Sequence, residues 1–205
     1  ILVATLIIGL ILMTFGLFDK NRHLLKSLEY YWGYWIIKSS FIPISVTGLE
    51  HLDLNQQYIF SSNHASLLDV PVTLSILKRP ILFMAKKELF LIPFFGWMLY
   101  TSGMIRVNRQ NAAEAQESIK RAVNILKSNN VSMLVYPEGS RSNTNELLPL
   151  KKGCFILAIQ SNLPIVPVKL YGTHDILPKH SLLLKPNKIS IHFHKPIQTN
   201  DLTLD

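Results

Sequence analysis

From Pro43 to the C-terminus, short apolar runs alternate with longer segments of helical periodicity. This alternation restricts the fold more than any other feature, because strands that alternate with helices form an α/β layer structure. We therefore predict an α/β fold with a central mixed, mostly parallel sheet flanked by helices. The predicted strands cover residues 44–46, 58–61, 81–85, 104–107, 132–136, 165–170 and 188–194.

The segments between these strands carry the helical patterns. The clearest is the segment 111–129, because its apolar residues recur at helical spacing and asparagines flank both of its ends. The predicted helices cover residues 67–78, 87–101, 111–129 and 150–161.

The N-terminal segment has a different character. Residues 1–18 contain no charged side chain, a basic turn follows at 19–23, and a second apolar stretch is rich in Tyr and Trp. Eighteen helical residues span roughly 27 Å, which barely matches the hydrocarbon core of a bilayer, and clustered Trp and Tyr suit the headgroup zone. We predict that residues 1–42 form a membrane-anchoring two-helix segment that spans the bilayer or dips into one leaflet, followed by an α/β domain at 43–205. A buried core hairpin is the alternative.

Composition narrows the range of partners. The chain of 205 residues has a formal net charge of +8, which attracts nucleic acid, anionic lipid surfaces, phosphorylated substrates or an acidic carrier protein. Aromatic residues do not interleave with basic ones in a stacking platform, so we expect no nucleic acid partner. The single cysteine forms no intrachain disulfide, and Cys/His zinc spacing is absent. His192 and His194 share one strand face but lack an evident third ligand, so we expect no metal site.

The first candidate site follows the strand that ends near residue 61. It reads Ser-Asn-His-Ala-Ser-Leu-Leu-Asp and contains His64 and Asp69. If a helix begins near Ser66, then Asp69 lies in its first turn and reaches back to the imidazole, which fixes the tautomer and raises the basicity of the other ring nitrogen. Such a pair can deprotonate an alcohol. The alternative is an ordinary start of a helix, with Ser66 as N-cap and Asp69 as its capping-box partner.

The second candidate site also follows a strand and reads Tyr-Pro-Glu-Gly-Ser-Arg-Ser from residue 136. Proline and glycine favour a turn there, and Arg141 offers a planar fork that suits phosphate. A solvated turn with a local Glu–Arg pair is the alternative.

Two further basic segments complete the candidates. On the strand near 103–109, Arg106 and Asn108 alternate with Ile105, Val107 and Arg109, so we expect one arginine to face solvent and the other to face the site. The stretch Leu-Lys-Lys-Gly-Cys-Phe from residue 150 opens a helix, where anions bind readily, although two solvated lysines would look the same.

Together the four segments resemble the glycerolipid acyltransferase family typified by 1-acylglycerol-3-phosphate acyltransferases. The family's Asn-His-x-x-x-x-Asp block is similar to residues 63–69, and its Phe-Pro-Glu-Gly-Thr-Arg-Ser block is similar to residues 136–142, with Tyr for Phe and Ser for Thr. A Gly-led strand ending in Arg matches residues 103–109, Lys-Lys-Gly-x-Phe matches 151–155, and a Pro-containing strand matches 165–168. The segment 103–109 departs most from the family pattern, because Arg-Val-Asn replaces a more apolar stretch.

The resemblance implies an enzyme that moves a fatty acyl group from acyl-CoA or acyl-ACP (acyl carrier protein) to the sn-2 hydroxyl of 1-acylglycerol-3-phosphate (lysophosphatidate). His64 would be the general base, Asp69 would orient it, and the hydroxyl would attack the thioester directly. The residues implied in substrate binding are Arg106, Arg109, Glu138, Gly139, Ser140, Arg141 and Lys152. No cofactor is implied. Membrane lipids would be partners, and the active site would lie at the cytoplasmic surface of a membrane.

Three alternatives stay open at this point. An acyl-thioester hydrolase would use the same His-Asp pair to activate water, and another lysolipid would serve equally as acceptor. A non-enzymatic membrane-binding module would use the positive charge alone. No Gly-x-Ser-x-Gly sequence occurs, which argues against a serine nucleophile of the α/β-hydrolase type.

Overall fold

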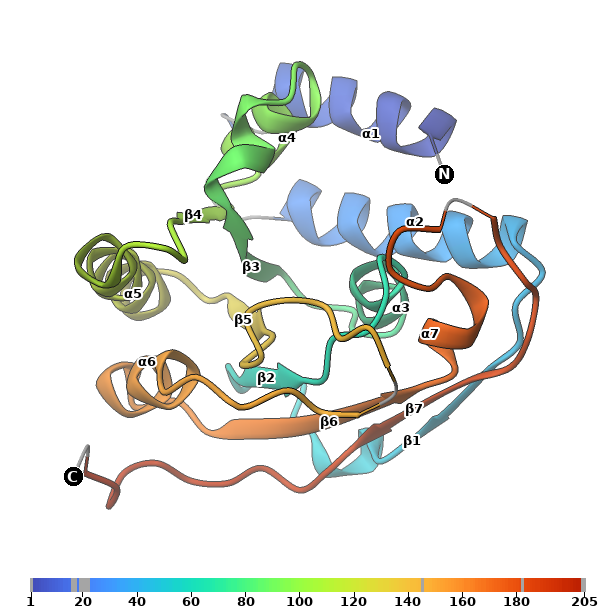
Figure 1. Cartoon of the computed structure of the whole chain (residues 1–205). Coiled ribbons are helices and arrows are strands. Elements are labelled where there is room, and N and C mark those ends of the chain that lie inside the picture. The colour runs from blue at the N-terminus through green and yellow to red at the C-terminus, as the bar shows by residue number, and fades with distance from the viewer. Residues whose placement is uncertain (1, 16–17, 19–22, 145, 182, 204–205) are drawn as a thin grey trace.

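The chain folds around one sheet, seen in a computed structural model that describes residues 2–15, 18, 23–144, 146–181 and 183–203 (Figure 1). In the described residues the sheet has seven strands in the order β1-β7-β6-β2-β5-β3-β4. All neighbouring strands are parallel except β6 and β7, so the predicted mixed, mostly parallel sheet is confirmed. The strands are β1 (Ile44–Thr47), β2 (Ile59–Ser62), β3 (Ile81–Lys86), β4 (Ile105–Val107), β5 (Ser132–Val135), β6 (Ile165–Tyr171) and β7 (Ile189–Phe193).

The direction of the strands brings the candidate segments together. Strand β2 lies between β6 and β5, and Ser61 pairs in register with Val135. Because parallel neighbours end at the same edge of a sheet, the loops after β2, β5, β3 and β4 emerge side by side. The segments that begin near residues 63, 108 and 136 therefore share one edge.

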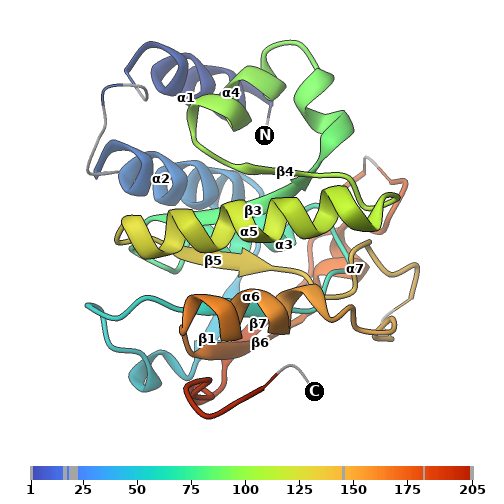
Figure 2. The same ribbon diagram turned by 90° about the vertical axis from the view of Figure 1, so that its left-hand side faces the viewer.

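Helices cover both faces of the sheet, as Figures 1 and 2 show. One face carries α2 (His23–Ser39), α3 (Asp69–Leu74) and α7 (Thr173–Ile176), and the other carries α5 (Ala112–Ser128) and α6 (Gly153–Ser161). Strand side chains alternate between the faces. Phe60 therefore packs in the hydrophobic core with α2, α3 and α7, and Ile59 in the core with α5 and α6.

Two helices precede the sheet, as predicted for residues 1–42, and α2 packs closely on the domain. Helix α1 (Leu2–Phe15) contacts α2 and α4 (Phe95–Thr101), and α2 contacts α3. A Cβ atom on Gly33 would lie 2.4 Å from the Pro71 carbonyl oxygen, so this approach of α2 to α3 requires glycine. The Ile81 amide also donates to the buried Glu29 carboxylate.

Among the described helices, none has both the length and the apolar character needed to cross a bilayer. Residues 19–22 of the predicted basic turn lie outside the described residues. The boundary at Pro43 and the membrane association of residues 1–42 stay predictions.

The prediction of one helix at 87–101 is wrong, because the chain breaks there. A 3-10 helix, η3 (Lys87–Leu91), is followed by Pro93 and by Phe94 with a φ of 69°, and only then by α4. Proline lacks an amide proton and disfavours helical backbone before it, so a continuous helix cannot form.

Other helices differ in extent. Those predicted at 67–78 and 150–161 are shorter, since α3 covers only Asp69–Leu74 and α6 begins at Gly153. Helix α7 (Thr173–Ile176), which has no counterpart among the predicted helices, begins directly after Gly172 in a left-handed conformation. A second 3-10 helix, η2 (Leu49–His51), follows β1.

Candidate active site

His64 and Asp69 form a direct pair at the carboxyl end of β2. The His64 Nδ1 atom lies 2.7 Å from Asp69 Oδ2, and the Asp69 side chain is fully buried. The same carboxylate oxygen accepts hydrogen bonds from the amides of Ala65 and Ser66, both at 2.8 Å. Because Nδ1 faces a carboxylate, it carries the proton and leaves Nε2 as the basic nitrogen.

The local chain explains how this pair forms. Asp69 is the first residue of α3, and the N-cap is Leu68, whose side chain makes no capping bond. Ser66 is not the N-cap residue, yet the contacts of the capping-box alternative are present: its amide donates to Asp69, and its hydroxyl oxygen accepts from the Leu68 amide. His64 is nevertheless no bystander, because it shares the same carboxylate oxygen. The buried Ser66 hydroxyl also donates to the Leu177 carbonyl oxygen, which anchors the loop to the segment after α7.

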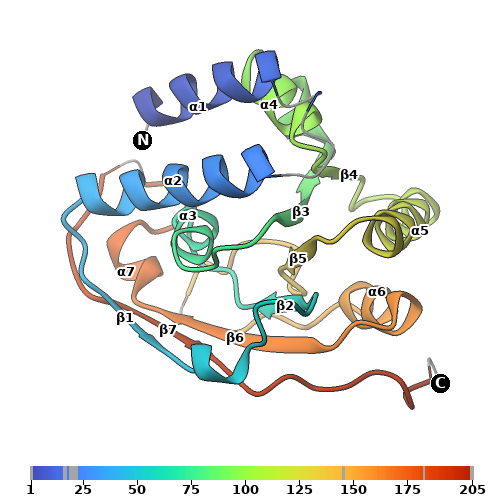
Figure 3. The ribbon, with the colours of Figure 1, turned by 180° about the vertical axis from the view of Figure 1, so that it is seen from behind.

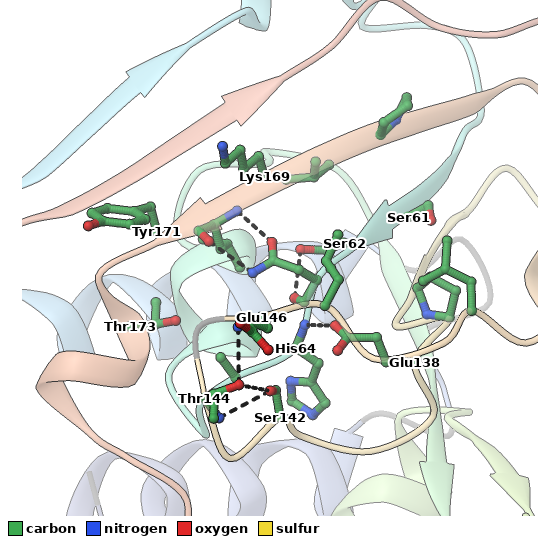
Figure 4. Close-up of a pocket in the computed structure, with 18 of the residues that line it drawn as sticks. Ser61, Ser62, His64, Glu138, Ser142, Thr144, Glu146, Lys169, Tyr171 and Thr173 are labelled. Atoms are coloured by element: carbon green, nitrogen blue, oxygen red, sulfur yellow. Dashed lines mark hydrogen bonds between the residues drawn. The ribbon is translucent and has the colours of Figure 1, made fainter.

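The turn after β5 holds the backbone of His64. The His64 amide donates to Glu138 Oε1 at 2.6 Å (Figure 4). The His64 carbonyl oxygen accepts from the Ser142 amide at 2.8 Å. The second oxygen of Glu138 accepts from the Leu148 amide at 2.9 Å. The Glu138 carboxylate is thus occupied by two backbone amides, and it positions the base rather than reaching freely into solvent.

Asn63 fixes the other side of the same loop. Its side-chain oxygen accepts from the Leu170 amide at 2.7 Å, and its side-chain nitrogen donates to the Leu170 carbonyl at 2.9 Å. The side chain therefore bonds to β6 just beyond the last paired residue of β2. Sequence reasoning missed this role, although an asparagine directly before the candidate base was a visible signal.

Tyr136 lies against the imidazole of His64. The two ring centroids are 4.0 Å apart and the ring planes differ by 19°, which is a stacked arrangement. Burial raises the pKa of Tyr136 well above its ordinary value, the nearby Asp69 charge raises it further, and the neighbouring Thr73 side chain opposes the shift. The phenol therefore stays neutral. This ring is a second residue that sequence reasoning did not assign to the site.

Arg109 and Lys151 flank Gly139 on the far side of the turn. An Arg109 Nη1 proton is donated to the Gly139 carbonyl oxygen, and Gly139 has a φ of +70°. A Cβ atom on Gly139 would lie 3.0 Å from Lys151 Nζ. Partial burial lowers the pKa of Arg109, and the Glu88 carboxylate opposes this shift. A guanidinium stays charged under such a shift, so two cations stand at this turn.

The remaining predicted binding residues lie outside this arrangement. Arg106 is exposed on β4, where its carbonyl oxygen accepts from the Ser118 hydroxyl. Ser140 and Lys152 are exposed, and Lys152 is the N-cap residue of α6. The Arg141 carbonyl oxygen accepts from Lys179 Nζ at 3.1 Å, and Arg141 is half-buried. Lys151, not Lys152, is the lysine beside the turn, because α6 begins only at Gly153 and Lys151 still belongs to the loop.

Two cavities lie on either side of Pro137, which lines both. The larger, of about 600 Å³, is lined by His64, Glu138, Ser142 and the end of β6 (Figure 4). The smaller, of about 150 Å³, is lined by Arg109, Lys151, Gly139 and Tyr136. His64 therefore lines one cavity and the two cations line the other, and the turn that contains Pro137 separates the two cavities.

Cys154 does not serve as a nucleophile in this arrangement. It is buried, and burial raises its pKa to about 11, although a hydrogen bond to Ser61 opposes the shift. The thiolate is the reactive form of cysteine. The thiol therefore stays protonated at neutral pH, so Cys154 does not form a thioester with the acyl group in the smaller cavity.

Groups of three or more metal-binding side chains are not found in the described part of the chain. His192 and His194 do lie together, with ring centroids 4.4 Å apart, but His192 Nδ1 is 2.7 Å from the Thr47 hydroxyl. This pair is a local contact of β7.

Comparison with known proteins gives a consistent result. Residues 43–171 match a family model described as Acyltransferase. The chain is 38% identical over 167 residues to a 1-acyl-sn-glycerol-3-phosphate acyltransferase of Cocos nucifera, with 82% of this chain and 53% of that protein covered. It is 36% identical to the Saccharomyces cerevisiae protein of the same name, with 80% and 54% covered. The chain spans about half the length of these relatives.

A solved structure is also similar. The crystal structure of the 1-acyl-sn-glycerophosphate (LPA) acyltransferase PlsC of Thermotoga maritima aligns with a TM-score of 0.78 and 25% sequence identity. The alignment covers 98% of this chain and 87% of that one. The helices that precede the sheet are therefore included in the match.

Proposed function

The chain belongs to the Acyltransferase family, and from this membership and the geometry of its site we propose that it acylates 1-acylglycerol-3-phosphate. The product is phosphatidate, and the donor is an acyl thioester carried by CoA or acyl carrier protein. No cofactor enters this proposal. The observation that carries it is the 2.7 Å contact between His64 and Asp69, held by the turn whose other side carries Arg109 and Lys151.

The reaction needs one base. His64 Nε2 takes the proton of the sn-2 hydroxyl while the oxygen attacks the thioester carbonyl carbon. The tetrahedral intermediate collapses, the C–S bond breaks, and the thiolate leaves with the proton that the imidazolium returns. Asp69 stabilises the imidazolium throughout. Because the lipid hydroxyl attacks the thioester directly, no acyl-enzyme is needed.

The cations beside Gly139 suit the acceptor phosphate. Arg109 presents a planar fork and Lys151 a point charge, which are the two common ways in which proteins bind phosphate. The cavity of about 600 Å³ beside His64 offers room for the thioester end of the donor. The two substrates would then approach the base from different sides of the 136–139 turn.

The proposal is tested by mass spectrometry of the products formed by purified protein. The protein is offered acyl-CoA or acyl-ACP, each with lysophosphatidate, other lysophospholipids, glycerol-3-phosphate or no acceptor. We expect phosphatidate and free thiol in equal amounts only with lysophosphatidate. Release of free fatty acid at the same rate without acceptor would instead identify a thioester hydrolase, and a product with another lysolipid would correct the acceptor.

Replacing Arg109 with alanine should raise the KM for lysophosphatidate about 10- to 100-fold, because a charge-assisted hydrogen bond to phosphate contributes about 1.5–3 kcal/mol. The KM for the donor should change little. Arg109→Lys should fall between, since the charge remains but the fork is lost. The matched control is Arg121→Ala, which removes an exposed arginine from α5. An unchanged acceptor KM in Arg109→Ala would remove this residue from the phosphate site.

We also propose that the protein works on the cytoplasmic surface of a membrane, attached by an apolar surface made of α1, η3 and α4. Leu6, Ile7 and Leu10 of α1 are exposed. So are Leu91, Ile92, Trp97 and Tyr100. Helices α1 and α4 lie side by side in Figures 1 and 3, and they are in contact. Exposed apolar residues gathered in this way are typical of lipid contact, and the +8 charge favours anionic lipid.

Flotation with vesicles tests this attachment. We expect binding to vesicles of phosphatidylcholine with phosphatidylglycerol, weaker binding to phosphatidylcholine alone, and loss of binding when Ile7 and Trp97 are both replaced with aspartate. Leu54→Asp is the control, because Leu54 is also apolar and exposed but follows η2. Equal binding by all three proteins would contradict the proposed surface.

A further inference from the structure

The face of the His64 imidazole is covered by one aromatic ring, and this contact has no role in the reaction as written above. Tyr136 is the first residue after β5, and Val135 pairs in register with Ser61 of the neighbouring strand. Two residues separated by 72 positions are therefore brought to the same level of the sheet edge. Their ring centroids are 4.0 Å apart.

We propose that Tyr136 is a positioning residue for the base, whose ring both orients the His64 imidazole and stabilises the imidazolium formed when the lipid hydroxyl loses its proton. The proposal rests on the proposed function, because it assigns His64 the role of base. In this proposal the His64 imidazole has two supporting contacts: Asp69 at the ring edge and Tyr136 on the ring face.

The two contacts restrain different motions. Asp69 Oδ2 bonds to Nδ1 at the ring edge, which fixes one direction in the plane. Tyr136 lies parallel to the ring, within 19°, which opposes swinging of the imidazole toward β5. The backbone on both sides is held by Glu138 and Ser142. Nε2 is then the one ring nitrogen left for the substrate.

The stacked ring also acts on charge. The face of an aromatic ring is negative, so it attracts a cation placed over it, and the attraction grows where water is excluded. The Tyr136 phenol is buried and its raised pKa keeps it neutral, so it adds no competing charge. The protonated imidazole is therefore favoured by the ring, whereas the neutral imidazole gains only packing.

The charged and titratable groups in contact with His64 come from three places. Asp69 is provided by α3 and Glu138 by the turn after β5, and Tyr136 is the residue that directly follows β5. A change at Tyr136 leaves both carboxylates in place. A shift in pH dependence on changing Tyr136 alone is then attributable to the ring.

The test compares Tyr136→Phe, which keeps the ring, with Tyr136→Leu, which removes it. Tyr136→Leu should lower kcat on the order of 10-fold with little change in the acceptor KM, and should move the acid limb of the rate profile down by about 0.5–1 pH unit. The limb moves down because an imidazolium without the ring gives up its proton more easily. Tyr136→Phe should keep kcat within about 3-fold of the wild type, and the acid limb of its rate profile should lie at the same pH.

A matched control separates this effect from loss of packing. Phe60→Leu removes a buried ring from β2 that lies in the core and not against His64. It should lower the melting temperature as Tyr136→Leu does, but leave the acid limb in place. If Phe60→Leu moves the limb equally, or if Tyr136→Leu does not move it, the proposal is wrong.

A second readout does not depend on turnover. The ring current of Tyr136 should shift the His64 ring protons upfield in the NMR spectrum, and the shift should persist in Tyr136→Phe and vanish in Tyr136→Leu. Unshifted protons in the wild type would overturn the stacking itself. Shifted protons in a protein that transfers no acyl group would contradict the proposed function but not the contact.

Discussion

Replacing His64 with alanine should reduce acyl transfer about 100- to 10,000-fold while the protein remains folded, because general-base help of this size is lost with the imidazole. The Asp69 carboxylate would lose one of its three hydrogen-bond partners but would keep the amides of Ala65 and Ser66. Loss of one such bond lowers the free energy of unfolding by about 1–3 kcal/mol. The measurements are the rate of phosphatidate formation and the melting temperature.

The control for this variant is His51→Ala. His51 also lies near a carboxylate, with Nε2 at 3.9 Å from Glu50 Oε1, but it belongs to η2 and lines neither cavity described above. Its removal should leave the rate unchanged. If His64→Ala retains more than about a tenth of the wild-type rate, a loss too small for general-base help, His64 is not the base.

Replacing Asp69 with asparagine should lower kcat about 100- to 10,000-fold, for a different reason. His64 Nδ1 and the amides of Ala65 and Ser66 all meet one carboxylate oxygen, so the amide oxygen takes that position and the loss comes from charge. A neutral amide does not stabilise the imidazolium as a carboxylate does. Because Asp69 is fully buried, its replacement leaves polar groups without suitable partners and lowers the free energy of unfolding by about 1–3 kcal/mol.

The rate and the melting temperature of Asp69→Asn are compared with those of Asp53→Asn. The Asp53 carboxylate accepts from the Asn55 amide at 2.8 Å in an exposed turn, so its change should alter neither quantity appreciably. A kcat for Asp69→Asn within about 5-fold of the wild type would show that the negative charge of Asp69 does not support the base, because general-base help is worth about 100-fold or more.

The strands were predictable from the sequence, and their neighbours were not. Each predicted strand overlaps an observed one, because a short apolar run between turn residues reports directly on local backbone preference. The order β1-β7-β6-β2-β5-β3-β4 depends on pairing between segments far apart in the chain. No local pattern records which strands become neighbours.

The helices show the same division. The ends of α5 agree with the prediction because the signals are local: the Asn111 side chain accepts from the Glu114 amide, as an N-cap does. The signal for the break in 87–101 is equally local, because Pro93 disfavours helical backbone at the residue before it. Helix α7 is too short to show periodicity, so packing alone determines it.

The sequence by itself predicted the pairing of His64 with Asp69, because the two residues are only five positions apart, in the loop and first helical turn that follow β2. Tertiary structure decided the rest of the site. Only the parallel pairing of β2 with β5 places Tyr136 on the imidazole and Glu138 on the His64 amide. Only the start of α6 at Gly153 decides that Lys151, and not its neighbour, lies beside Gly139. The physical reason is that bonds between adjacent residues act over a few positions of the chain, whereas these contacts exist only once the sheet has assembled.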